Sequence, residues 1–176
     1  GVKIKKIAPK HYVVYGKGLG SLFSKKNDNL NFGNSGTLAR LLIGILSTTP
    51  NIQVNISGDS SLNRRSMKKL IILMNKFGAI FLPKKKFHFP LKLISSNAPI
   101  PMNYKSGLSA QLKSAVIFAG LNSYGITTIS ETEESRNHTE NMLLKNNQAI
   151  KINSKKKVIK IIEKKYLKPI HIDVPG

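Results

Sequence analysis

Residues 32–40 read Phe32-Gly33-Asn34-Ser35-Gly36-Thr37-Leu38-Ala39-Arg40. This order predicts the end of a strand, a tight glycine turn and the first turn of a helix. Gly33 and Gly36 have no Cβ, so a ligand can approach the backbone closely there. Asn34, Ser35 and Thr37 can each cap the helix, whose first N–H groups are free and carry partial positive charge. The stretch can therefore hold an anion, although the same pattern also serves as a plain strand-to-helix connection.

The arrangement occurs twice in the chain. Gly36 and Gly107, 71 residues apart, each open an apolar helix, and Arg65 and Arg136, also 71 apart, each lie at the predicted start of the next helix. Both units therefore consist of helix, strand, helix and hairpin, the mark of a repeated structural unit. Strand–helix–strand connections favour parallel pairing, and the hairpins add antiparallel strands. We expect an α/β fold in which the helices are buried and mixed sheets lie outside.

The elements expected from apolar periodicity are as follows. Helices are predicted at residues 37–47, 64–77, 108–121 and 136–145. Hairpins are predicted from 2–7 with 11–15, 79–82 with 87–94, and 149–152 with 158–162. Single strands are predicted at 52–56, 126–130 and 170–174, and loops at 16–31, 57–63, 95–107 and 131–135.

The repeat divides the chain into three parts. Residues 1–31 are expected to be the closing hairpin and loop of a truncated first unit, 32–106 the second unit, and 107–176 the third unit with an exit strand. The chain starts at Gly1, directly before a strand-like run, and stops directly after another. We therefore expect one incomplete domain of a longer protein.

Composition excludes several classes of protein. The 176 residues include no cysteine, so disulfides, zinc–thiolate sites and cysteine nucleophiles are excluded. The longest apolar run, Leu41–Leu46, is too short to span a bilayer, and no signal peptide is present, so we expect a cytoplasmic location.

The net charge of +21 raises the alternative of a basic nucleic-acid-binding module. Against it, the lysines are scattered and aromatic residues make up only 7% of the chain. The four arginines among 29 basic residues indicate that Arg is kept where its planar fork matters, as for carboxylate or phosphate; they are Arg40, Arg64, Arg65 and Arg136.

If the units pack about a common axis, the ends of their elements converge. Gly36 and Gly107 would bring helix N-termini, Arg65 and Arg136 would bring guanidinium groups, and Ser109–Lys113 would add hydroxyl, amide and ammonium groups. An arginine at a helix start opposes the helix dipole, which an anionic ligand would offset. This cluster predicts a pocket for a small anion such as phosphate.

Other titratable residues add little to this interpretation. The four histidines lack the spacing of metal ligands. Glu131, Glu133 and Glu134 share one predicted loop and are expected to be solvated, so the chain offers anion binders without a convincing general base.

The motifs resemble those of the 5-enolpyruvylshikimate-3-phosphate synthase family, in order and over nearly the whole chain. They are Gly33-Asn34-Ser35-Gly36-Thr37 with Arg40, Gly58-Asp59-Ser60-Ser61-Leu62 with Arg65, Ser109-Ala110-Gln111 with Lys113-Ser114, Ser135-Arg136 with His138-Thr139-Glu140, and Val174-Pro175-Gly176. The resemblance implies βαβαββ units with helices inside, an inside-out α/β barrel of which this chain would be part. It also implies transfer of an enolpyruvyl group from phosphoenolpyruvate to shikimate 3-phosphate, without a metal or organic cofactor.

The resemblance also implies roles for particular residues. Gly36 and Arg65 would contact phosphoenolpyruvate, Ser109 and Arg136 would hold the shikimate phosphate, and Gln111 would lie between the two substrates. Supporting roles would fall to Asn34, Arg40 and Lys113. Glyphosate would compete with phosphoenolpyruvate near Gly36, and we expect the full protein to be sensitive to it.

Two departures and two alternatives accompany the resemblance. Ser66 stands where the family usually has proline, and Asn137 where it usually has aspartate. The proton-transfer groups of the other domain are absent, so this chain alone is expected to be inactive without the remainder of the enzyme. A UDP-N-acetylglucosamine enolpyruvyl transferase, which commonly uses a loop cysteine, is the related alternative, and a nucleic-acid-binding module is the unrelated one.

Overall fold

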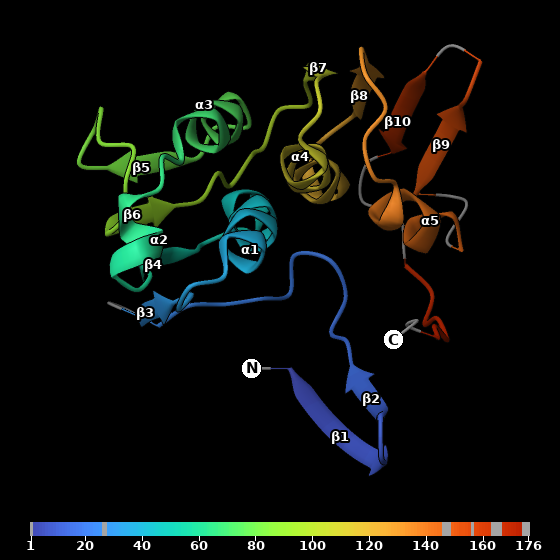
Figure 1. Ribbon diagram of the computed structural model, residues 1–176, viewed down its shortest axis with the longest axis horizontal. Coiled ribbons are helices and arrows are strands. Elements are labelled where there is room, and N and C mark those ends of the chain that lie inside the picture. The colour runs from blue at the N-terminus through green and yellow to red at the C-terminus, as the bar shows by residue number, and fades with distance from the viewer. Residues whose placement is uncertain (1, 26–27, 146–148, 156, 163–166, 174–176) are drawn as a thin grey trace.

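The computed structural model describes residues 2–25, 28–145, 149–155, 157–162 and 167–173. Two mixed sheets lie on opposite sides of a central group of helices, and an N-terminal hairpin extends away from this body (Figure 1). The helices are α1 (Gly36–Thr48), α2 (Ser60–Arg64), α3 (Lys68–Lys76), α4 (Ala110–Asn122) and α5 (His138–Leu144). None of them is long and apolar enough to cross a membrane.

The first sheet has the strand order β3-β4-β6-β5. Its strands are β3 (Asp28–Asn31), β4 (Gln53–Ser57), β5 (Ile80–Leu82) and β6 (Leu91–Ile94). β3 and β4 are parallel and are joined through α1, whereas β6 is antiparallel to both β4 and β5. The alternating burial of β4 places Val54 and Ile56 against the helices and its polar residues outside.

The second sheet repeats this topology with the order β7-β8-β10-β9. Its strands are β7 (Asn103–Ser106), β8 (Ile126–Glu131), β9 (Ile150–Asn153) and β10 (Val158–Ile162). β7 and β8 are parallel and joined through α4, and β10 is antiparallel to β8 and β9. The expected α/β fold with repeated units, buried helices and outer mixed sheets is confirmed, and the described residues form no closed barrel.

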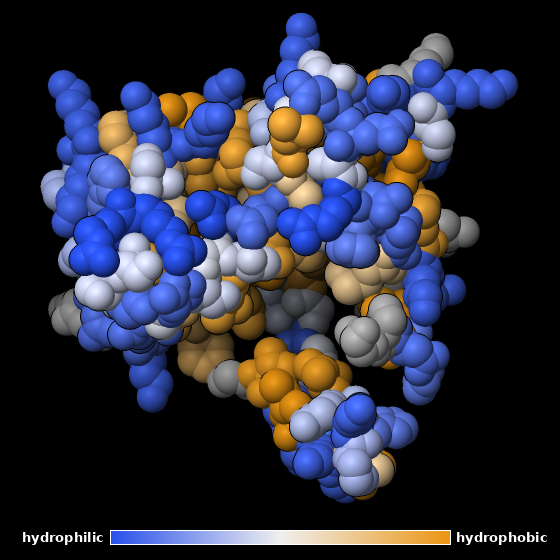
Figure 2. All heavy atoms as spheres, viewed as in Figure 1, coloured by the Kyte–Doolittle hydropathy of each residue, from blue (hydrophilic) through white to orange (hydrophobic). Residues whose placement is uncertain are grey.

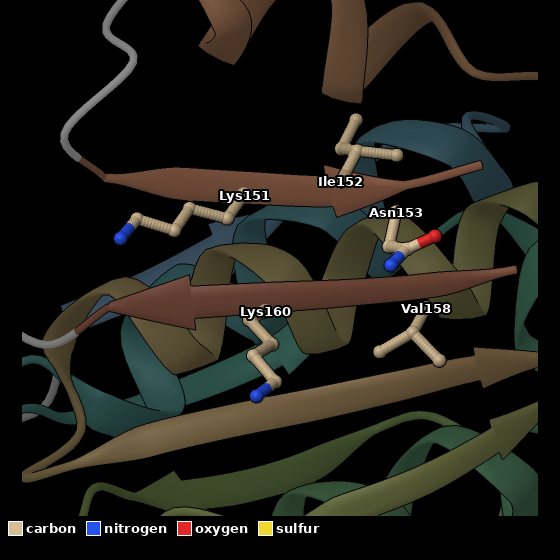
Figure 3. Close-up of a pocket in the computed structure, with 5 residues that line it drawn as sticks. All are labelled: Lys151, Ile152, Asn153, Val158 and Lys160. Atoms are coloured by element: carbon tan, nitrogen blue, oxygen red, sulfur yellow. The ribbon is translucent and has the colours of Figure 1, made fainter. Parts of the chain in front are cut away.

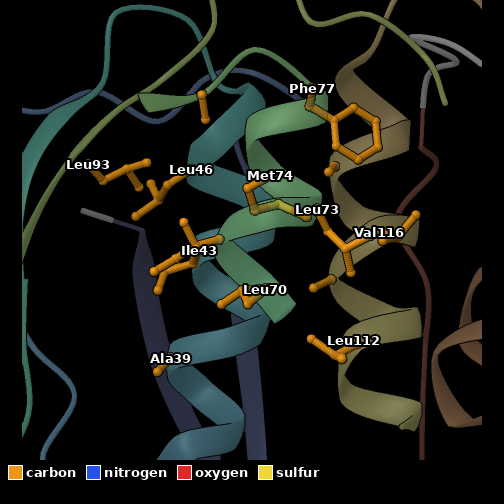
Figure 4. Packing of buried hydrophobic residues seen from close by; sticks show 14 of the residues in the cluster. Ala39, Ile43, Leu46, Leu70, Leu73, Met74, Phe77, Leu93, Leu112 and Val116 are labelled. Carbon is orange, nitrogen blue, oxygen red and sulfur yellow. The ribbon is translucent and has the colours of Figure 1, made fainter. Parts of the chain in front are cut away.

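The core lies between the sheets, where α1, α3 and α4 pack together (Figure 4). α1 and α4 approach closely because Gly44 has no side chain: a Cβ built there would lie 2.6 Å from the carbonyl oxygen of Ala115. α4 is buried on almost every side, and its Ala115, Val116 and Ile117 are fully inaccessible to solvent. This accounts for the apolar sequence all round this helix.

The N-terminal hairpin of β1 (Lys3–Ala8) and β2 (His11–Tyr15) is antiparallel, as predicted. Its apolar residues are largely exposed, among them Ile4 at 64% and Val14 at 60%. Figure 2 shows hydrophobic side chains gathered on the part of the hairpin nearest the body, and a mostly hydrophilic surface over the body itself.

The four helices and three hairpins predicted from periodicity are present, but several boundaries and four elements differ. The predicted loops at 16–31, 57–63 and 95–107 contain β3, α2 and β7. β3 and β7 are polar edge strands whose pairing with β4 and β8 holds them, so they show little apolar alternation. α3 begins at Lys68 and not at residue 64, because Arg65 is extended (φ −76°, ψ 133°). No strand forms over 170–173, and residues 174–176 lie outside the described residues.

Candidate functional site

The turn before α1 has the predicted form of strand, glycine turn and helix. Phe32 N donates to Ser57 O (2.9 Å), and Asp59 N donates to Gly33 O (2.8 Å), so the turn is fastened to the segment after β4. Gly33 has a φ of +54°, in the left-handed region that favours glycine. Ser35 caps the helix by accepting a hydrogen bond from Leu38 N at 3.2 Å.

Two guanidinium groups lie next to Gly36. Arg40 Nη1 donates to Gly36 O (3.0 Å), and Arg65 Nη2 donates to Asn34 Oδ1 (2.8 Å) and less closely to Ser61 Oγ (3.4 Å). A Cβ built on Gly36 would lie 2.8 Å from Arg40 Nη1 and 3.3 Å from Arg65 Nη1. The predicted group of Gly36, Arg65, Asn34 and Arg40 is therefore assembled in one place, from the start of α1 and the end of α2.

No carboxylate among the described residues compensates the charges at this place. Burial lowers the pKa of Arg40, and the positive charge of Arg65 lowers it further. Among the described residues, the ion pairs involve Lys113, Lys157 and His171, and neither arginine faces a carboxylate. Two like charges beside the start of α1 favour the binding of an anion.

A second helix start lies beside the first. Ser109 caps α4 by accepting from Leu112 N (3.3 Å), in the same way that Ser35 caps α1. Gln111 Nε2 donates to Thr37 Oγ1 (2.7 Å), which links the first turns of α4 and α1. The structure therefore brings Ser109 and Gln111 to the same end of the helix pair as Gly36.

Arg65 and Arg136 do not both occupy helix starts. Arg65 is the C-cap of α2, an end where a cation is favoured, so the argument from an opposed helix dipole is wrong for this residue. Arg136 lies immediately before the N-cap of α5, Asn137, and its side chain is exposed. Arg136 lies in the connection between β8 and α5, and no contact between Arg136 and Arg65 is described.

Lys113 has a different environment from the open anion pocket expected for it. Its side chain is fully buried, and its Nζ lies 2.7 Å from Glu131 Oε1 and 2.6 Å from Glu140 Oε1. The expectation that Glu131 is solvated is wrong for the same reason, since it pairs with this ammonium at 17% exposure. A lone lysine inside an apolar helix is the sequence feature that could have indicated this ion pair, because a buried charge requires a partner.

Two hollows lie away from the arginine pair. One, of about 410 Å³, lies on the outer face of the β9–β10 hairpin, where Lys151 and Lys160 from neighbouring strands lie side by side (Figure 3). The other, of about 490 Å³, lies beside α5 and includes Glu131, Glu140 and Ser135 in its lining. Neither hollow has Gly36 or Arg65 in its lining.

Comparison with known proteins gives a consistent result. The model of the EPSP synthase (3-phosphoshikimate 1-carboxyvinyltransferase) family matches residues 1–176. A 3-phosphoshikimate 1-carboxyvinyltransferase of Parvibaculum lavamentivorans is 37% identical over 180 residues, covering 100% of this chain and 40% of the relative. Another, of Acidiphilium cryptum, is 41% identical over 144 residues, covering 81% of this chain and 32% of the relative. The chain thus spans 40% or less of the length of these relatives.

Solved structures extend the comparison. An EPSP synthase structure from Acinetobacter baumannii has a TM-score of 0.81 and 30% identity, covering 93% of this chain and 36% of that one. The enolpyruvyl transferase NikO from Streptomyces tendae has a TM-score of 0.53 and 15% identity, covering 93% and 38%, which indicates a shared fold alone.

Proposed function

Because the chain belongs to the EPSP synthase family, we propose that it forms one wall of an enolpyruvyl transferase active site. The whole enzyme transfers the enolpyruvyl group of phosphoenolpyruvate to the 5-hydroxyl of shikimate 3-phosphate and releases phosphate. This is a step of aromatic amino acid biosynthesis, and we place it in the cytoplasm on the same basis.

The phosphoenolpyruvate side of the site is formed by Gly36, Arg40 and Arg65, with Asn34 as support. The main support for this proposal is the pair of guanidinium groups that face Gly36 without a carboxylate partner among the described residues. A guanidinium fork suits the planar carboxylate and the phosphate of this substrate. Asn34 orients the Arg65 fork by accepting its Nη2 proton.

The shikimate phosphate side is formed by Ser109, Gln111 and Arg136. Ser109 and Arg136 are exposed, so both can reach a ligand. Gln111 lies between the two helix starts, and its bond to Thr37 at 2.7 Å supports a position between the two substrates. Glyphosate, a small anion, would take the place of phosphoenolpyruvate at Gly36.

The division of the chain into residues 1–31, 32–106 and 107–176 is part of this proposal. The matching strand orders of the two sheets support it. The groups that stabilise the transition state have to surround the substrate in a closed active site. We therefore expect that the 176-residue chain alone does not catalyse the reaction. Steady phosphate release from both substrates by the isolated chain would contradict that expectation.

The proposal is tested by calorimetric titration of the full-length product of the gene with shikimate 3-phosphate and phosphoenolpyruvate. We expect saturable binding of shikimate 3-phosphate. A parallel titration with a DNA duplex at two salt concentrations tests the alternative of a basic nucleic-acid-binding module. A steep salt dependence with DNA and no response to shikimate 3-phosphate would overturn the proposed function.

A further inference from the structure

The buried ammonium of Lys113 connects three elements. Lys113 lies in the first turn of α4, and its Nζ contacts Glu131 at the end of β8 (2.7 Å) and Glu140 in the first turn of α5 (2.6 Å). It also donates to the carbonyl oxygen of Ser135 in the connection between them (3.4 Å). The ammonium donates hydrogen bonds to Glu131 and to Ser135 O, and Glu140 adds a second carboxylate in ion-pair contact.

The connection held in this way carries Arg136, which follows Ser135 directly. The start of the connection is fastened separately, because Thr132 Oγ1 donates to Ser106 O at 2.8 Å at the end of β7. The backbone on the N-terminal side of Arg136 is therefore fixed to α4, the helix that also presents Ser109. Ser109 and Lys113 are four residues apart and lie on the same face of that helix.

Stability alone gives a weak reason for this cluster. Glu140 is only 2% exposed, and Lys113 is its one partner among the described residues. Burying three charges is costly, and apolar residues of similar volume often serve stability equally well. The neighbours Leu112, Ala115 and Val116 are buried and apolar, so an apolar residue would suit position 113. A lysine adds a defined geometry that an apolar residue lacks.

We propose that Lys113 is a positioning residue for shikimate 3-phosphate: it fixes the 131–140 segment so that Arg136 faces the phosphate held at Ser109. Lys113 does not itself touch the ligand, because its ammonium is enclosed by protein acceptors. This inference rests on the proposed function. It adds to that function an explanation of how α4 aligns the two phosphate-binding residues, Ser109 and Arg136.

The test uses Lys113→Met and a matched control, Ser114→Ala, in the full-length gene product. Ser114 also joins α4 to α5, through hydroxyls of Ser114 and Thr139 that lie 2.8 Å apart, but it does not hold the Arg136 connection. We expect Lys113→Met to weaken shikimate 3-phosphate binding by about tenfold or more. We expect the KM for phosphoenolpyruvate to change by less than about twofold, and Ser114→Ala to leave both values near those of the parent.

Hydrogen exchange supplies a readout that needs no substrate. Backbone amides of residues 132–139 should exchange faster in Lys113→Met than in the parent or in Ser114→Ala. A folded Lys113→Met with unchanged exchange would overturn the positioning role, as would equal losses for both substrates. If the parent fails to bind shikimate 3-phosphate, the proposed function fails, while the exchange data still decide whether Lys113 fixes the segment.

A milder variant covers the case in which Lys113→Met does not fold. Glu131→Gln keeps the size of the side chain and leaves the Lys113–Glu140 pair in place. We expect it to fold, to weaken shikimate 3-phosphate binding by roughly threefold, and to speed exchange of the same amides. Unchanged binding and exchange in this folded variant would overturn the proposal.

Discussion

At the scale of single residues, Arg40 and Arg65 both lie beside Gly36 without a carboxylate partner among the described residues. Their mutual repulsion opposes folding slightly, and an anion would reverse it. The pair is thus arranged for a ligand and not for stability. This distinguishes the two arginines from Lys113, whose charge is compensated inside the protein.

We predict that Arg65→Ala retains stability and loses anion binding. The free energy of unfolding should stay within about 0.5 kcal/mol of the parent, because an exposed side chain and its repulsion of Arg40 are both removed. Thermal unfolding with and without inorganic phosphate measures this, and phosphate should stabilise the parent but not the variant. If phosphate stabilised the parent and Arg65→Ala equally, its binding site would not include Arg65.

Gly36→Ala tests the close approach at the same point. The added Cβ would lie 2.8 Å from Arg40 Nη1, so the guanidinium has to move, while the helix itself accepts alanine readily. We expect an unchanged or higher melting temperature and a loss of about tenfold in phosphoenolpyruvate and glyphosate affinity. Inhibition kinetics of the full-length product measure the affinities, and a variant as sensitive to glyphosate as the parent would argue against contact at Gly36.

The sequence predicted some of these residue environments and not others. The glycine turn at Gly33 follows from local chemistry, so residues 32–40 were sufficient to predict it, whereas they offered three N-caps, of which the structure selects Ser35. The approach of Arg65 to Asn34 joins positions 31 residues apart and depends on how the loop after β4 folds back. The partners of Lys113 lie 18 and 27 residues away, so only the tertiary structure identifies them.

At the scale of elements, the crossing of α1 and α4 sets the distance between the two helix starts. Gly44 allows this crossing, since a Cβ there would lie 2.6 Å from Ala115 O and 2.9 Å from Ala115 Cα. Both atoms belong to the backbone, so the helices themselves have to separate to admit a methyl group.

We predict that Gly44→Ala destabilises the protein by about 1–3 kcal/mol, because overpacking outweighs the better helix propensity of alanine. Gly16→Ala is the matched control, since no atom lies within 4 Å of its Cβ position, and it should change stability by less than about 0.5 kcal/mol. Urea denaturation measures both. A Gly44→Ala variant as stable as the control would contradict the close approach of α1 and α4 at this residue.

The cluster that joins α4 to β8 and α5 predicts a dependence on alkaline pH. Burial alone would lower the pKa of Lys113, but the carboxylates of Glu131 and Glu140 outweigh burial and raise it. A raised pKa in the folded state contributes stability that is complete below the ordinary lysine pKa of about 10.4 and is lost as pH rises through the folded pKa. The unfolding free energy of the parent relative to that of Lys113→Met should therefore be constant from about pH 7 to 10 and fall above that range.

Element prediction succeeded where the elements are apolar. α1 and α4 are mostly apolar and β4 alternates apolar with polar residues, and all three were predicted within one or two positions. β3 and β7 were missed because each is a polar strand that its neighbour holds in place. α2 was missed because five residues are too few to show a helical periodicity. Only its N-cap marks its start: Leu62 N donates to Asp59 Oδ1 (2.7 Å).

At the scale of the whole molecule, the two sheets share one strand order and enclose the helix pair α1 and α4. The starts of these two helices meet through Gln111 and Thr37, so the two repeated units bring their helix N-termini to a common place. The repeat spacing of 71 residues predicted that these helix starts would converge if the units pack about a common axis.

The most direct test of the central claim is the steady-state rate of phosphate release by the full-length gene product. Phosphoenolpyruvate and shikimate 3-phosphate are varied in turn, for the parent and for Arg65→Ala. We predict release that requires both substrates in the parent and falls by more than about tenfold in the folded variant, with a raised KM for phosphoenolpyruvate. Release independent of shikimate 3-phosphate, or an Arg65→Ala variant with the kinetics of the parent, would contradict the account.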